Sequence, residues 1–318
     1  MNENNTLYIV VPCYKEQEVL PETSRRLKEK VLALRAQGKI SDKSRIIFVN
    51  DGSSDDTWPI ICRLHEQEPE LFSGVNLSRN RGHQNALLAG LMTAVNFADM
   101  VISMDADLQD DINAVDAMVD HYHEGYEVVY GVRSKRDTDT FFKRFTAEGF
   151  YKVMKALGVD IVFNHADYRL MSRRAGEGLA QFKEVNLFLR GIVPQIGYKW
   201  TTVTYERAER FAGESKYPLK KMLAFAADGI TSFSVKPIRL VLSIGIVVFM
   251  VSIVMMIYAL VSKLMGHTSA GWTSLMGSIW MIGGIQLLSL GVIGEYVGKI
   301  YKESKHRPRY IIESVLNK

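Results

Sequence analysis

Two late stretches of the chain contain no charged residue. The first runs from Leu240 to Ser262 and the second from Thr273 to Gly294. A helix rises about 1.5 Å per residue, so each stretch is long enough to cross the hydrocarbon layer of a bilayer, which is about 30 Å thick. A pair of buried core helices is the alternative, but such helices are usually shorter and keep a polar stripe. We therefore predict a transmembrane hairpin within residues 237–300, with spans at about 240–262 and 273–294.

The charges beside these stretches predict their orientation. Arg207–Arg239 carries a net charge of +4 and Glu295–Lys318 a net charge of +3, whereas the connection between the stretches has no formal charge beyond Lys263. Because Lys and Arg accumulate on the cytoplasmic side, a multi-pass protein of the cell membrane with both chain ends in the cytoplasm is predicted. The net positive charge of the chain then favours contact with anionic lipid headgroups. The chain has no basic run with interleaved aromatic residues, which is the pattern that would indicate nucleic-acid binding.

Strand-length apolar runs alternate with helical patterns in the first 132 residues, which predicts an α/β fold with a mostly parallel, doubly wound sheet. The strands are expected at Thr6–Val11, Arg45–Asn50, Phe72–Ser78, Met100–Met104 and Glu127–Val132, and the helices at Val19–Gln37, from Thr57 onward, at His83–Asn96 and at Asn113–Glu124. Residues 1–215 form the expected cytoplasmic domain. An amphipathic juxtamembrane segment at 216–236 and a basic cytoplasmic tail at 301–318 complete the predicted organisation. A second amphipathic pattern at 141–157 suits either a membrane-interface helix or one docked on the sheet.

Acidic side chains directly follow the fourth predicted strand. Asp105 and Asp107 are one residue apart, and Gln109 follows two residues later. If the chain stays extended, alternate side chains point the same way, so these three can converge on one point. Their oxygens suit Mg²⁺ or Mn²⁺, which usually completes its coordination shell with phosphate oxygens. A lone D-x-D is often only a solvated strand end, but its place after a buried strand favours a ligand site here.

The loops after the first two predicted strands face the same edge of the sheet. Tyr14 could stack on a base there, while Glu16 and Asp51 could accept hydrogen bonds from a base or ribose. Neither G-x-G-x-x-G nor G-x-x-x-x-G-K-[ST] occurs in the chain, which argues against dinucleotide cofactors and P-loop hydrolysis. We interpret the nearby His83 as structural.

Arginine and lysine side chains supply candidate phosphate ligands. Arg133 and Arg144 follow the fifth predicted strand, and guanidinium forks match phosphate oxygens, although a surface arginine is equally common. Arg207, Arg210 and Lys216 lie just before the predicted hairpin. These cations either anchor the chain to lipid headgroups or bind the phosphate of a lipid substrate.

Six motifs resemble, in order, those of the family-2 glycosyltransferases of GT-A fold that load sugars onto polyprenyl phosphates, the bactoprenol glucosyltransferase and dolichol-phosphate mannose synthase type. They are P-C-Y-K-E-Q-E at Pro12–Glu18, V-N-D-G-S-S-D-D-T at Val49–Thr57, L-S-R-N-R-G-H-Q-N-A at Leu77–Ala86, D-A-D-L-Q-D at Asp105–Asp110, D-Y-R-L-M at Asp167–Met171 and G-E-S-K-Y at Gly213–Tyr217. The chain departs from the family in two places. The family often has Asn where this chain has Lys15, and a proline pair where it has Asp111-Ile112, a change that falls in the loop after the predicted metal site.

The resemblance implies roles for particular residues. The nucleotide-sugar would be held by Pro12, Tyr14, Glu16, Asp51 and Asp105, and a Mg²⁺ or Mn²⁺ ion with the diphosphate by Asp105, Asp107 and Gln109. Asp167, together with Asp107, would be catalytic. The acceptor phosphate would be bound by Arg133 and Arg144, with Arg169, Arg207, Arg210 and Lys216 as further candidates.

The expected reaction is a metal-dependent, inverting transfer from a nucleotide-sugar to polyprenyl (undecaprenyl) phosphate, and the expected donor is UDP-glucose or a related UDP-sugar. Because a lipid phosphate is largely ionised at neutral pH, Asp167 need not be a strong base. A processive polysaccharide synthase is one alternative, but such enzymes carry Q-x-x-R-W where this chain offers only Q-I-G-Y-K-W at Gln195–Trp200. A non-catalytic nucleotide-sugar-binding scaffold is the other. A homo-oligomer and a flippase partner are compatible with the expected reaction.

Overall fold

The computed structural model describes residues 5–134, 165–185, 187–207, 236–265 and 271–317. The chain divides into two compact units. The first contains Met1–Tyr151, Asp160–Pro218 and Arg307–Lys318, and the second contains Lys152–Val159 and Leu219–His306. The predicted amphipathic patterns at 141–157 and at 216–235 lie outside the described residues.

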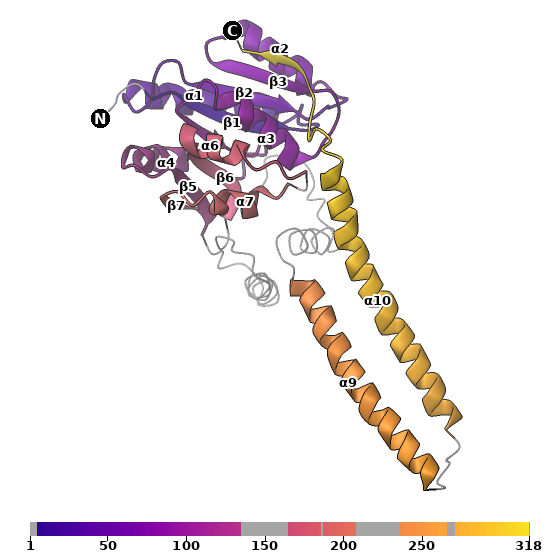
Figure 1. The fold of residues 1–318 in the computed structure, drawn as a ribbon. Coiled ribbons are helices and arrows are strands. Elements are labelled where there is room, and N and C mark those ends of the chain that lie inside the picture. The colour runs from indigo at the N-terminus through magenta and orange to yellow at the C-terminus, as the bar shows by residue number, and fades with distance from the viewer. Residues whose placement is uncertain (1–4, 135–164, 186, 208–235, 266–270, 318) are drawn as a thin grey trace. The chain divides into compact units, whose positions relative to one another are not determined.

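The first unit is built on an eight-stranded sheet with the order β7-β5-β6-β4-β1-β2-β3-β8 (Figure 1). The strands are β1 (Leu7–Cys13), β2 (Arg45–Asn50), β3 (Phe72–Leu77), β4 (Met100–Ser103), β5 (Val128–Arg133), β6 (His165–Ser172), β7 (Trp200–Tyr205) and β8 (Ile312–Leu316). Strands β1 to β4 are mutually parallel, as the alternation predicts. Outside the alternating region, β6 lies antiparallel between β4 and β5, and β8 lies antiparallel to β3. The sheet is therefore mixed, and the α/β fold class is confirmed.

Helices cover both faces of this sheet. They are α1 (Leu20–Ala36), α2 (Thr57–Gln67), α3 (His83–Ala94), α4 (Ala114–His123), α6 (Arg173–Ala180) and α7 (Leu189–Gln195). The apolar stripe of α1 shares one buried core with residues of α2 and α4. Helix α3 packs on the other face, where Gly90 permits the close approach. A Cβ at Gly90 would lie 2.4 Å from Val10 Cγ1, so any larger residue would push α3 away from β1.

Strand β1 is longer than the sequence predicts. We expected Pro12 to end it, but the register with β2 continues through Pro12 opposite Val49 and Cys13 opposite Asn50. Pairing of β1 with β4 stops at Val10, so on that side proline's missing N–H breaks no ladder. The extension brings the Tyr14 loop to the same level as the loop that follows Asn50.

The second unit contains the helices α9 (Lys236–Leu264) and α10 (Trp272–Ser304), which contact each other. The predicted spans at 240–262 and 273–294 fall inside them. Segments Lys236–Met255 and Met281–Ser304 are long and apolar enough to cross a membrane. Their large side chains are exposed, with Leu242 62% and Leu287 72% accessible. Because no described residue in the apolar window of either segment is buried, the structure argues against the alternative of two core helices.

The residues after α10 form a strand that the sequence analysis did not predict. β8 pairs with the edge strand β3, with Val315 opposite Val75 and Ser314 opposite Asn76. Ser78 N–H donates to the carbonyl of Ile311 at 3.0 Å, and Leu316 packs against the core. The chain therefore leaves the first unit before α9 and returns to it after α10.

Candidate functional site

The acidic motif forms a turn at the carboxyl end of β4. We expected an extended segment, but β4 ends at Ser103 and Leu108 adopts a left-handed backbone with φ of 57°. The carboxylate of Asp107 accepts a hydrogen bond from Gln109 N–H at 3.2 Å, which closes the turn. The expected geometry was therefore wrong. A side chain that accepts from the backbone two residues later favours a turn over a strand.

Asp105 lies among other titratable groups. Its Oδ1 is 3.4 Å from Nε2 of His83, which is also 4.0 Å from Oδ2 of Asp167. Loss of solvation raises the pKa of Asp105 to about 6, the positive field of His83 opposes the rise, and the nearby carboxylates of Asp110, Asp167 and Asp107 add to it. The repulsion among these carboxylates is of the kind that a bound cation relieves.

The donor set near Asp105 fits a hard divalent cation. Among the described residues, no group of three or more His, Cys, Asp or Glu side chains is arranged to hold a metal ion. Mg²⁺ typically binds through one or two carboxylates plus substrate phosphates, so a complete protein cage is not required. Asp105 and Asp107 supply such oxygens. Gln109 Oε1 accepts a hydrogen bond from Arg207, so one of its two lone pairs is already engaged.

Asp167 is buried on β6 and held by two arginines. Its Oδ1 is 2.7 Å from Nη2 of Arg169, and its Oδ2 is 3.0 Å from Nη2 of Arg190. Burial alone raises the pKa of Asp167, but the charges of Arg190 and Arg169 outweigh it and hold the pKa well below its usual range. Asp167 is therefore a permanent carboxylate at neutral pH.

Arg169 does not lie where a phosphate could reach it. Its side chain is 1% exposed, pairs with Asp167 and donates to the carbonyl of Leu189 at 3.4 Å. This contradicts the expectation that Arg169 binds the acceptor phosphate, because its fork is turned to groups inside the domain.

Two of the predicted phosphate-binding arginines share one polar cluster. Arg133 Nη2 lies 3.4 Å from Oδ1 of Asp110, its Nε donates to Tyr205 Oη at 3.2 Å, and Tyr205 Oη donates to Asp110 at 2.5 Å. Burial and then the charge of Arg133 lower the pKa of Arg207, while the charges of Asp107 and Asp110 oppose the shift. Arg207 also contacts Gln109, so both arginines lie at the acidic motif. Arg144, Arg210 and Lys216, the other candidates, lie outside the described residues.

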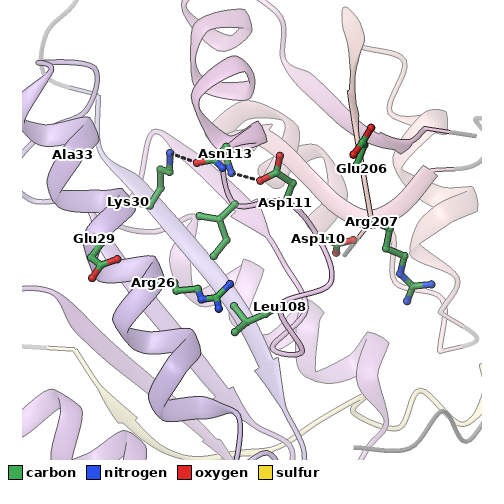
Figure 2. A pocket seen from close by; sticks show the side chains of 11 residues that line it. Arg26, Glu29, Lys30, Ala33, Leu108, Asp110, Asp111, Asn113, Glu206 and Arg207 are labelled. Carbon is green, nitrogen blue, oxygen red and sulfur yellow. Dashed lines mark hydrogen bonds between the residues drawn. The ribbon is translucent and has the colours of Figure 1, made fainter. Parts of the chain in front are cut away.

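A cavity of about 610 Å³ lies between α1 and the loop that follows the acidic motif (Figure 2). In Figure 2, Lys30 bonds to Asn113 on one side, while Asp110 and Arg207 lie on the other. Arg207 thus lines the cavity and also reaches Gln109. The proline pair of the family is replaced here by Asp111-Ile112. Asp111 Oδ1 accepts from Asn113 N–H at 2.9 Å, so it opens the helical segment as a capping side chain would.

The loops after β1 and β2 meet at the same edge of the sheet. Tyr14 is 45% exposed and available for stacking, and Pro12 beside it is buried in β1. Glu16 N–H donates to Thr57 Oγ1 at 3.0 Å, which ties this loop to the start of α2. The side chain of Asp51 accepts from the N–H groups of Arg81 and Gly82, at 2.7 and 2.9 Å. Asp51 therefore also shapes the 78–82 loop.

Lys15 adopts a left-handed backbone with φ of 56°. This conformation is unfavourable for residues with a long side chain and easier for Asn, the residue that the resemblance leads us to expect at this place. Replacing Lys15 with Asn is therefore expected to stabilise the protein by about 0.5–1 kcal/mol, raising Tm by about 1–3 °C. Thermal unfolding of the purified protein in detergent measures it, with Lys43→Asn at an exposed turn as the control. A lower Tm for Lys15→Asn alone would contradict this explanation.

Two residues at the site were missed by the sequence analysis. His83, which we interpreted as structural, is the first residue of α3 and lies between Asp105 and Asp167. The sequence could have predicted this, because His83 directly follows the loop after β3, and that loop lies at the same edge of the sheet as the acidic motif. Arg190 comes from α7, beyond the alternating region, and no local pattern pointed to it.

Comparison with known proteins identifies the family. The sequence pattern of glycosyl transferase family 2 matches residues 8–179, and that of the GtrB C-terminal hairpin matches residues 236–300. The chain belongs to glycosyltransferase family 2. It is therefore an enzyme that transfers glycosyl groups, and its sheet is of the GT-A type.

Relatives in this family match almost the full chain. The uncharacterized glycosyltransferase YkoT of Bacillus subtilis (strain 168) is 55% identical over 307 residues, which cover 96% of this chain and 91% of the relative. The bactoprenol glucosyl transferase of Shigella phage SfV is 40% identical, covering 96% of this chain and 97% of the relative. Among solved structures, mannosyl-3-phosphoglycerate synthase from Rubrobacter xylanophilus is 14% identical with a TM-score of 0.47, covering 70% of this chain and 71% of that one.

Proposed function

We propose that this enzyme transfers a sugar from a nucleotide-sugar to polyprenyl phosphate at the cytoplasmic face of the cell membrane. The observation that carries the proposal is the full-length similarity to a bactoprenol glucosyl transferase, hairpin included. UDP-glucose or a related UDP-sugar is the proposed donor, and undecaprenyl phosphate the proposed acceptor.

Tyr14 and the loops around Glu16 and Asp51 are proposed to hold the nucleotide, and Asp105 and Asp107 to face its diphosphate. Bound Mg²⁺ or Mn²⁺ would stabilise the negative charge that develops on the leaving diphosphate. Arg190 adds positive charge beside Asp167, and His83 lies next to Asp105. Arg133 and Arg207 are the proposed ligands of the acceptor phosphate, because both guanidinium groups lie at the acidic motif, Arg133 beside Asp110 and Arg207 on Gln109.

The acceptor phosphate is the proposed nucleophile and needs no strong base, since its second ionisation has a pKa of about 6 by analogy with phosphorylated side chains. The low pKa of Asp167 supports the same conclusion, because a carboxylate held by two arginines does not accept a proton at neutral pH. Its proposed role is to orient Arg190 toward the reacting groups. Direct displacement inverts the anomeric centre, so an α-linked donor gives a β-linked product.

The path of the chain supports the proposed membrane topology. The segments up to Pro218 and from Arg307 onward belong to the same unit, so the helices between them would cross the bilayer an even number of times. The two exposed apolar helices are proposed to form a multi-pass hairpin. The positive charge of the flanking segments favours the cytoplasm for the catalytic unit and for both chain ends.

The proposal is tested by incubating the purified full-length protein with undecaprenyl phosphate and a panel of UDP- and GDP-sugars in the presence of Mn²⁺. We expect one UDP-hexose to give a lipid product whose mass equals that of undecaprenyl phosphate plus one hexosyl group. A polymeric product would favour the processive synthase instead. Tight nucleotide-sugar binding without turnover would favour the scaffold.

A further inference from the structure

The strand β8 is joined to the proposed nucleotide loops by a chain of side-chain hydrogen bonds. Asn76 Nδ2 donates to Glu313 Oε2 at 2.8 Å, and Asn50 Nδ2 donates to Asn76 Oδ1 at 2.7 Å. Ser53 N–H then donates to Asn50 Oδ1 at 3.2 Å, and Lys15 N–H donates to Ser53 Oγ at 3.0 Å. This series of hydrogen bonds thus starts on β8 and ends in the loops that follow β2 and β1.

A register shift in the pairing of β8 with β3 puts Glu313 at the start of this series of hydrogen bonds. Ser314 pairs with Asn76 and Ile312 with Leu77, so Glu313 is an extra residue where the register shifts. A bulge of this kind re-aims a side chain. Here it brings the carboxylate of Glu313 to the amide of Asn76 on the neighbouring strand.

The carboxylate of Glu313 fixes which way the amide of Asn76 faces. An ionised carboxylate only accepts, so it draws the amide nitrogen of Asn76 and turns the amide oxygen toward Asn50. Asn50 is 2% exposed, so its amide has to find partners inside the domain. The amide nitrogen of Asn50 donates to Asn76, so its amide oxygen is the atom that accepts the hydrogen bond from Ser53 N–H.

A second contact from the same segment supports the third loop of the site. The carbonyl of Ile311 accepts a hydrogen bond from Ser78 N–H at the end of β3. The residues just beyond are those whose N–H groups, at Arg81 and Gly82, hold Asp51. The segment Ile311–Leu316 therefore contacts the base of the 78–82 loop directly and reaches the loop after β2 through Asn76.

We infer that β8 positions the nucleotide-binding loops, with Glu313 and Asn76 as positioning residues. The inference rests on the proposed function in that it takes these loops to bind the donor. It makes the segment after the membrane hairpin a working part of the donor site, although neither residue contacts the donor in this assignment.

Reversing the charge at residue 313 tests the inference. A lysine there can only donate, so Glu313→Lys turns Asn76 over and sets the amide nitrogen of Asn50 against Ser53 N–H. Glu313→Gln keeps an accepting oxygen and is the conservative variant. Glu66→Lys, on the exposed face of α2, makes the same charge change elsewhere and is the control. Asn76→Ala removes two of the bonds without altering charge.

Two measurements on the full-length protein decide the outcome. The first is hydrogen exchange without nucleotide in peptides covering residues 13–18 and 50–56. The second is UDP affinity together with KM and kcat for the donor. We expect faster exchange in both peptides for Glu313→Lys and Asn76→Ala, with UDP affinity about 3- to 10-fold weaker, a higher donor KM and an unchanged kcat. Glu313→Gln and Glu66→Lys should match the wild type.

Unchanged exchange in both peptides for Glu313→Lys and Asn76→Ala would overturn the inference, as would equal effects in Glu66→Lys. A wild-type protein that binds no nucleotide would overturn the proposed function instead. The exchange measurement would still show whether β8 orders the two loops, so the two failures can be told apart.

Discussion

Replacing Asp107 with Asn is expected to lower sugar transfer by about 10³-fold, equivalent to about 4 kcal/mol of transition-state stabilisation. The amide keeps the size of the side chain and an oxygen that can accept from Gln109 N–H, but it removes the negative charge that a divalent ion needs. Transfer of labelled sugar from the nucleotide into organic-extractable lipid, measured at saturating Mn²⁺, gives the rate.

Asp111→Asn is the matched control for this experiment. Asp111 lies four residues later in the same loop, and its side chain accepts from Asn113 N–H, a bond that asparagine can also make. The control should keep near-wild-type activity. If Asp107→Asn transferred sugar as fast as Asp111→Asn, Asp107 could not be part of the metal site.

Replacing Asp167 with Ala is expected to destabilise the protein by about 3–5 kcal/mol, because it leaves the charge of Arg169 buried without a partner. Arg190 can still turn to solvent, since its side chain is 31% exposed, whereas that of Arg169 is 1% exposed. Thermal unfolding of the detergent-solubilised protein should show a Tm lower by about 10 °C.

The double variant Asp167→Leu with Arg169→Met separates a broken ion pair from a lost packing contact. With both charged partners replaced by apolar side chains, no unpaired charge stays buried, so at least half of the lost stability should return. A double variant as unstable as Asp167→Ala would show that the charge of Arg169 is not the cause.

The stability difference between the wild type and Asp167→Ala should also depend on pH in one direction. The folded-state pKa of Asp167 lies below its usual range, so the ionised carboxylate stabilises the fold above the unfolded-state pKa of about 4. The difference should be constant from pH 5 to 8 and shrink as the pH falls below about 4. A difference that grew on acidification would contradict the assignment of Asp167 as a paired carboxylate.

The parts of the fold that depend on local pattern could be predicted from the sequence. The spacing of Leu20, Leu27, Val31 and Leu34 predicted α1, and the uncharged stretches predicted α9 and α10. Strand β8 could not be predicted in the same way. Ile312–Leu316 pairs with β3, more than 230 residues earlier, and nothing in its own five residues specifies that partner.

The residues of the candidate site also divide into those that the local sequence predicts and those that depend on distant contacts. Asp105 and Asp107 could be found because they follow a buried strand. The turn at Leu108 depends on a left-handed backbone, which a leucine in the sequence does not predict. Arg169 was assigned to the wrong surroundings because the sequence does not show that Asp167, two residues away, folds back onto it. Arg190 lies 23 residues from Asp167, and only the packing of α7 near β6 brings them together.

The order of synthesis gives the last strand a further consequence. β8 is synthesised after α9 and α10, so the edge of β3 lacks its neighbouring strand until both of these helices have been made. An uncovered strand edge can pair with other chains, and this edge stays open to such pairing until β8 is in place. The first unit is thereby completed only after the two apolar helices have been synthesised.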